Sequence, residues 1–187
     1  MRIFIKNMVC PRCVSSVEKI FDEINVPIKN IVLGEVEPIN ELSPIQLAKL
    51  DELLTNNGFE RIDDKRTRLI SAVKTFIIQK IHHQESLLLN MNWSDTLQEH
   101  LHYEYNYLSS LFSSVEGITI EQYIIKQKVE RVKELLVYDE LSLGEIADKL
   151  AYSSIAHLSA QFKKVTGFTP TVFKKQFPHK RNSIDKL

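Results

Sequence analysis

An internal repeat at an offset of 50 residues dominates the second half of this 187-residue chain. Residues 107–119 (YLSSLFSSVEGIT) align without gaps on residues 157–169 (HLSAQFKKVTGFT). The identical pairs are Leu108 and Leu158, Ser109 and Ser159, Phe112 and Phe162, Val115 and Val165, Gly117 and Gly167, and Thr119 and Thr169. Because the shared apolar residues recur at helical spacing, the repeat predicts two copies of one helical motif.

The residues around the second copy predict two short helices. Ser142 is followed three residues later by Glu145, which is the pattern of a capping box at a helix start. A short turn at residues 151–153 leads into the next helix, and Gly167 ends that helix because glycine tolerates positive φ. The apolar side of the second helix is predicted to hold Leu158, Phe162 and Val165. Two short helices with a tight turn between them predict a helix-turn-helix unit.

The repeat extends this prediction to the preceding part of the chain. A first helix-turn-helix unit is expected over residues 94–115, and residues 120–138 (IEQYIIKQKVERVKELLVY) predict one connecting helix between the two units. In each unit the second helix presents small and polar side chains, which let the edge of a base approach. The predicted DNA contacts are Tyr105, Asn106, Ser109, Ser110 and Ser113 in the first unit, and Ser154, Ile155, Ala156, His157, Ser159, Ala160, Lys163 and Lys164 in the second. The alternative is a pair of ordinary helical hairpins with solvated polar faces.

Charge distinguishes the two units. The net charge of the whole chain is zero, which taken alone argues against a nucleic-acid partner. Residues 141–187, however, hold eight Lys and Arg against three acidic residues, whereas residues 94–125 hold five acidic residues and no Lys or Arg. Because neutralisation of phosphates dominates affinity for DNA, we expect the second unit to anchor the protein and the first to contribute weakly.

Residues 141–177 carry a dense motif, made up of Ser142, Glu145, Ile146, Ala147, Leu150, Tyr152, Ser153, Ser154, Leu158, Phe162, Lys163, Lys164, Gly167, Thr169, Pro170 and Phe173. This motif resembles the second DNA-binding motif of the AraC/XylS family of bacterial transcription regulators. It has Ala151 where that family usually has glycine, and Ala160 where arginine is common. The connecting helix is similar to the family's linker helix through Tyr123, Ile124, Lys128, Val129, Val132, Leu135 and Leu136. The resemblance implies an all-α domain that binds double-stranded DNA.

The first 64 residues show a different pattern. Residues 2–9, 28–39 and 59–62 predict strands, the middle segment being either one strand or two short ones. Pro11 and Pro44 each favour the start of a helix. The order β-α-β-(β)-α-β predicts a ferredoxin-like domain. The expected fold is therefore an α+β N-terminal ferredoxin-like domain followed by an all-α double helix-turn-helix DNA-binding domain.

The chain has two cysteines, Cys10 and Cys13, at the start of the first predicted helix. In a chain without a signal peptide, this spacing suggests metal or redox chemistry more than a structural disulfide. The start of a helix also favours the thiolate form. The run Met8-Val9-Cys10-Pro11-Arg12-Cys13-Val14, with Val17-Glu18 and Asn57-Gly58-Phe59, resembles the heavy-metal-associated domain. That resemblance implies that both thiols bind Cu(I) or Zn(II).

Four interpretations of the cysteine pair stay open. The chain is a regulator that responds to a soft metal ion, a thiol-based redox-responsive regulator, or a metal-binding protein of the chaperone kind. In the fourth, the domain is kept for its fold and dimer contacts, with inert or incidentally reactive thiols. No glycine-rich phosphate loop, nucleophile motif or HExxH spacing is present, so an enzyme is not expected.

The segment between the two predicted domains forms a linking helix, assigned to residues 65–90. Its apolar stripe predicts self-association of two copies through residues 66–85, and the two histidines at its end are expected to be solvated. The stripe consists of Leu69, Val73, Phe76, Ile77 and Ile81. The predicted domains are thus residues 1–64, the linking helix, residues 91–178 and a basic tail at 179–187. With no apolar run long enough for a membrane span, we expect a cytoplasmic protein.

Overall fold

The computed structural model describes residues 2–62, 65–84, 87, 91–138 and 140–176. It divides into two units, Met1–Phe76 and Ile77–Leu187. The boundary lies inside helix α3 (Lys65–His82), whereas the sequence places the first boundary at residue 64. Residues 65–76 of α3 therefore belong to the first unit and residues 77–82 to the second.

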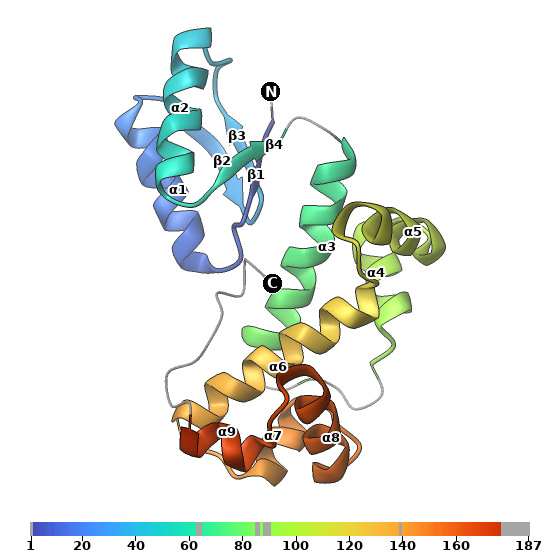
Figure 1. The fold of residues 1–187 in the computed structure, drawn as a ribbon. Coiled ribbons are helices and arrows are strands. Elements are labelled where there is room, and N and C mark those ends of the chain that lie inside the picture. Colours follow the sequence, from blue (N-terminus) through green and yellow to red (C-terminus); the bar gives the residue numbers. More distant parts are fainter. Residues whose placement is uncertain (1, 63–64, 85–86, 88–90, 139, 177–187) are drawn as a thin grey trace. The chain divides into compact units, whose positions relative to one another are not determined.

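The first unit contains a four-stranded sheet and two helices (Figure 1). The elements follow one another as β1 (Ile3–Lys6), α1 (Pro11–Glu23), β2 (Ile28–Val32), β3 (Glu35–Pro38), α2 (Pro44–Asn56) and β4 (Glu60–Ile62). The strands are arranged in the order β2-β3-β1-β4, and every neighbouring pair is antiparallel. Residues 28–39 form two strands because Gly34, with a φ of 81°, turns the chain between them.

The helices of the first unit begin where the sequence predicts. Pro11 and Pro44 each lie in the first helical turn. Ser43 caps α2 in a reciprocal arrangement with Gln46: the Gln46 N–H donates to Ser43 Oγ over 3.3 Å, and the Ser43 N–H donates to Gln46 Oε1 over 3.0 Å. The core of this unit is built from one face of the sheet and the inner sides of both helices, with Ile3, Ile5, Val17, Phe21, Val36, Leu50 and Leu54 all buried.

The second unit is helical. Its helices are α4 (Trp93–Leu101), α5 (Tyr105–Glu116), α6 (Ile120–Tyr138), α7 (Leu143–Lys149), α8 (Ile155–Thr166) and α9 (Pro170–Gln176). The helix pair α4–α5 precedes α6 and the pair α7–α8 follows it, and both pairs pack on α6 (Figure 1). The two predicted helix-turn-helix units and the connecting helix are therefore confirmed. Among the described residues, no helix is long and apolar enough to cross a membrane.

The second helix of each pair ends at a glycine with a left-handed backbone conformation. Gly117 ends α5 with a φ of 70°, and Gly167 ends α8 with a φ of 81°. One expectation was wrong: Val165 is 43% exposed and its repeat counterpart Val115 is 53% exposed, so neither belongs to the core. The buried stripe of α8 therefore ends at Phe162.

The end of α3 also differs from expectation. His82, predicted to be solvated, is buried, and its Nε2 lies 2.9 Å from Gln127 Oε1 of α6. Ile77, Ile78 and Ile81, in the last two turns of α3, are buried as well. These side chains are therefore not available on the surface of a single chain. Self-association through residues 66–85 stays a prediction.

Candidate nucleic-acid interface

The second helix pair is defined by two side-chain caps. At the start of α7, the Ser142 N–H donates to Glu145 Oε2 over 2.7 Å and the Glu145 N–H donates to Ser142 Oγ over 3.3 Å, which confirms the predicted capping box. The Ser142 hydrogen bonds hold the pKa of the Glu145 carboxyl below its usual value. At the start of α8, Ser154 Oγ accepts from the His157 N–H over 3.1 Å. Both helices of the pair therefore begin at a defined residue.

The outer face of α8 is open to solvent. Leu158 and Phe162 are buried on its inner side, whereas Ser159 is partly exposed and the other predicted contacts are exposed, namely Ser154, Ile155, Ala156, His157, Ala160, Lys163 and Lys164. Small side chains lie in the middle of this face, and two lysines lie in the last turn of the helix. Such a surface suits the approach of a base edge flanked by phosphate contacts.

His157 and Tyr152 form the border of that face. His157 Nδ1 lies 3.0 Å from Ser153 Oγ, and its ring stands edge-on to the ring of Tyr152 at a centroid distance of 5.3 Å. The Tyr152 hydroxyl donates to Gln161 Oε1 over 2.8 Å. The turn before α8 is therefore attached to two successive turns of that helix.

The corresponding face of the first pair has a different chemistry. Asn106 and Ser110 are exposed, and Tyr105, Ser109 and Ser113 are partly exposed. The Tyr105 hydroxyl donates a short hydrogen bond to the Glu121 carboxylate of α6. The pKa of Tyr105 is raised mainly by burial and secondly by the neighbouring carboxylate. The hydrogen bond from Tyr105 lowers the pKa of Glu121. An anionic carboxylate therefore lies beside a residue that was predicted to contact DNA.

Two aromatic residues beside this face were missed in the sequence. Tyr107 is 49% exposed, and its ring stacks on that of Tyr103 with centroids 5.8 Å apart. Tyr107 is the repeat counterpart of His157, which was included among the predicted contacts. The repeat therefore could have predicted Tyr107 as a DNA contact. The stacking of Tyr107 on Tyr103 is not predicted by any pattern in the sequence.

The two cysteines lie at the start of α1. Cys10 is the residue that precedes the helix and Cys13 lies in its first turn, with 3.4 Å between the two sulfurs. Burial raises the pKa of the Cys13 thiol. The helix start was expected to lower this pKa and favour the thiolate, but the effect of burial is larger. Among the described residues, no cluster of three or more His, Cys, Asp or Glu side chains could hold a metal ion.

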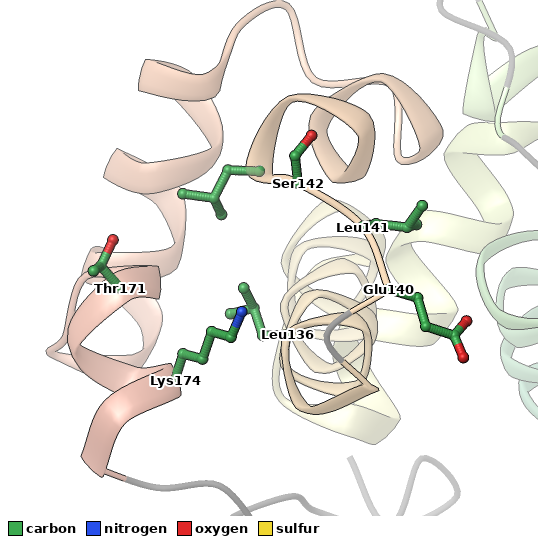
Figure 2. Close-up of a pocket in the computed structure, with 7 residues that line it drawn as sticks. Leu136, Glu140, Leu141, Ser142, Thr171 and Lys174 are labelled. Atoms are coloured by element: carbon green, nitrogen blue, oxygen red, sulfur yellow. The ribbon is translucent and has the colours of Figure 1, made fainter.

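A pocket of about 380 Å³ lies in the second unit between the end of α6, the start of α7 and α9 (Figure 2). It is lined by Leu136, Glu140, Leu141, Ser142, Leu143, Thr171 and Lys174. None of these residues belongs to the predicted DNA contacts. The pocket is therefore separate from the candidate interface on α8.

Comparison with known proteins identifies the helical unit. Residues 97–176 match the family described as "Helix-turn-helix domain". The chain is 33% identical over 100 residues to "Uncharacterized HTH-type transcriptional regulator YtdP" of Bacillus subtilis, which is 54% of this chain and 13% of that protein. It is 24% identical over 152 residues to "Msm operon regulatory protein" of Streptococcus mutans, which is 81% of this chain and 51% of that protein.

A solved structure has the same helical arrangement. The C-terminal domain of AraT, a response regulator from Geobacillus stearothermophilus, superposes with a TM-score of 0.50 and 26% identity, covering 64% of this chain and 92% of that one. The chain spans about half or less of the length of the curated relatives that it matches first. Residues 97–176 are therefore a helix-turn-helix domain.

Proposed function

We propose that this chain is a sequence-specific DNA-binding transcription regulator that is anchored on DNA by its second helix pair, α7–α8. The observation that carries the proposal is the exposed outer face of α8, with small residues at its centre and Lys163 and Lys164 in its last turn. A helix of this kind fits the major groove, where all four base pairs can be distinguished. The relatives named as transcriptional and operon regulators support the same function.

The two helix pairs share α6, so one chain carries two candidate recognition helices, α5 and α8. Such helices can enter successive major grooves about 34 Å apart. The α5 face has exposed neutral donors and acceptors at Asn106 and Ser110 but no cation, and Glu121 lies beside Tyr105. We expect α5 to influence sequence preference, while most of the affinity comes from α8 and the basic residues that follow it.

Selection from a pool of randomised duplexes tests this function directly. The full chain is used to enrich bound duplexes, and the selected site is then footprinted. We expect one preferred sequence, with protection over two adjacent major grooves on one face of the duplex. Retention of duplexes without any sequence enrichment, or no retention at moderate salt, would contradict the proposal.

The N-terminal unit is proposed to sense a soft metal ion. Its element order and its strand order β2-β3-β1-β4 support a ferredoxin-like arrangement, and the two sulfurs at the start of α1 are 3.4 Å apart. Two thiolates suit Cu(I), whereas Zn(II) in proteins is almost always four-coordinate. Since the described residues offer no third ligand nearby, a small thiol or a second chain would complete a zinc site. When bound, the ion would supply charge neutralisation and a cross-link between Cys10 and Cys13.

A Cys10→Ser/Cys13→Ser variant tests metal sensing. We expect the wild-type chain to bind one Cu(I) per chain and to change its affinity for the selected duplex on metal addition. The variant should lose both properties. If metal leaves the DNA affinity of both proteins unchanged, the metal-sensing proposal is wrong. Metal binding without any DNA binding would favour the chaperone-like alternative.

The short distance between the two sulfurs also supports a second candidate, redox sensing. A small disulfide oxidant would accept the two electrons and two protons that leave the Cys10 and Cys13 thiols as their disulfide forms. Treatment with oxidised glutathione, followed by measurement of DNA affinity, separates this candidate from metal sensing. A change in affinity that a reducing thiol reverses, and that the serine variant lacks, would favour redox sensing.

A further inference from the structure

Tyr152 connects the turn of the second helix pair to both of its helices. It is buried, and its N–H donates to the Ala147 carbonyl of α7 over 2.9 Å. Its hydroxyl donates to Gln161 of α8 over 2.8 Å, and the His157 ring packs edge-on against its ring. A displacement of this side chain would therefore change the position of α8 relative to α7.

A lysine of the linker helix lies over the same ring. Lys128 Nζ of α6 is 5.0 Å from the centroid of the Tyr152 ring, which is within the range of a cation–π interaction. Among the described residues, no carboxylate forms an ion pair with Lys128. The contact of this ammonium with the ring of Tyr152 joins α6 to the turn before α8.

The environment of Lys128 is unfavourable for a charge. Burial lowers the pKa of this ammonium to about 8. A partly buried cation without an anionic partner destabilises a fold, and an apolar side chain of similar length would be cheaper to bury. Ionisable groups kept in such environments are concentrated at functional sites. Lys128 is therefore a candidate for a functional role, and its contact with the ring offsets part of the cost of burying the ammonium.

The first helix pair has a tyrosine at the corresponding place in its turn. The left-handed residue is His102 in the first pair, with a φ of 58°, and Ala151 in the second, with a φ of 53°, so Tyr103 corresponds to Tyr152. Tyr103 stacks on Tyr107, and among the described residues no lysine or arginine lies over its ring. The cation contact is consequently not required to build a helix pair of this type, and it occurs in the pair that carries the lysine-bearing face.

We propose that Lys128 and Tyr152 are positioning residues for the reading of bases by α8, through the contact of the ammonium with the aromatic ring. The inference rests on the proposed DNA-binding function. In helix-turn-helix proteins the N-terminal end of the recognition helix contacts base edges, and here that end begins at Ile155, three residues after Tyr152. Base recognition requires placement to within about 0.5 Å. Contacts with phosphates tolerate larger displacements, so discrimination between sequences should suffer first.

The test compares Lys128→Met, Lys128→Arg and the control Lys126→Met in the full chain. Lys126 lies on the same helix, is exposed and carries the same charge. The affinities for the selected duplex and for a random duplex are measured over a series of salt concentrations. We expect Lys128→Met to lower the ratio of the two affinities by about tenfold, with the random-duplex affinity and the salt slope unchanged. Lys128→Arg should retain the ratio to within about twofold, because an arginine also stacks on an aromatic ring.

Thermal unfolding separates positioning from loss of structure. Because Lys128→Met removes a desolvated charge, it should unfold at the same temperature as the wild type or higher, while its discrimination falls. Tyr152→Phe keeps the ring and removes the hydrogen bond to Gln161, so it should lower the ratio by less than Lys128→Met does.

Several results would overturn the inference. A salt slope reduced by about one for Lys128→Met would assign the lysine to a direct phosphate contact instead. Equal loss of affinity for both duplexes, a Lys128→Arg variant as defective as Lys128→Met, or an equal effect of Lys126→Met would each refute positioning. A wild-type chain that shows no preference among duplexes would refute the proposed function itself, whereas a discriminating wild type with unaltered variants refutes only the role of Lys128.

Discussion

At the scale of single residues, a left-handed backbone position has a direct consequence for stability. Ala151, where the resembling family usually has glycine, has a φ of 53° in the turn between α7 and α8. A residue with a Cβ in this backbone region is destabilised by roughly 1–2 kcal/mol. Glycine avoids this strain, but its greater backbone freedom in the unfolded chain offsets part of the gain. We therefore expect Ala151→Gly to raise the free energy of unfolding by about 0.5–1 kcal/mol in urea titrations. Ala160→Gly, inside α8, is the matched control and should lower it by about 1 kcal/mol. Equal effects of the two substitutions would contradict the argument.

Lys128 predicts a pH dependence at the same scale. Its pKa is lowered from the ordinary value of 10.5 to about 8 in the folded chain, so between these values the unfolded chain binds more protons. The free energy of unfolding of the wild type, relative to that of Lys128→Met, should therefore increase from about pH 8 to pH 10.5, and the wild type should be at its greatest disadvantage below pH 8. Denaturant titrations of both proteins at several pH values measure this difference. A constant difference over the window would show that Lys128 is not desolvated.

At the scale of secondary-structure elements, the end of α3 is joined to α6 by a buried hydrogen-bond chain. His82 Nε2 and Gln127 Oε1 are 2.9 Å apart, and Gln127 Nε2 donates to the Tyr123 hydroxyl over 3.0 Å. Gln127→Leu would leave the polar atoms of both neighbours without this partner, which typically costs about 1–3 kcal/mol. Urea unfolding should show a loss of that size, whereas the exposed Lys126→Leu on the same helix should change the free energy of unfolding by less than about 0.5 kcal/mol. A neutral Gln127→Leu would mean that α3 is not held on α6 by these bonds.

At the scale of the whole molecule, the separation of charge between the helix pairs predicts unequal contributions to DNA binding. Removing both Lys163 and Lys164 should weaken binding to all duplexes and reduce the slope of log affinity against log salt by up to about 2, since each lost phosphate contact reduces it by about 0.9. Replacing Asn106 and Ser110 with alanine should cost less affinity and act mainly on sequence preference. Competition binding at several salt concentrations separates the two variants. A larger total loss for the Asn106/Ser110 variant would show that charge does not divide the roles of the two pairs.

Most of the secondary structure follows from local patterns in the sequence. The capping box at Ser142, the glycines that end α5 and α8, and the repeat offset of 50 residues each act within a few turns of the chain, so they predicted the helix pairs and the connecting helix. The same repeat predicted which face of α8 is exposed, because Leu158 and Phe162 are spaced for burial on the other side.

The remaining features depend on contacts between residues far apart in the chain. His82 and Gln127 are separated by 45 positions. Lys128 and Tyr152 are separated by the whole of α7. The periodicity of the sequence therefore predicts neither contact. The raised pKa of Cys13 likewise results from burial, which overrides the local helix-start effect that the CxxC spacing predicts. Local hydrogen bonding and apolar spacing are encoded over three to four residues, whereas burial and electrostatics depend on which distant side chains pack together, and that is settled only when the chain has folded.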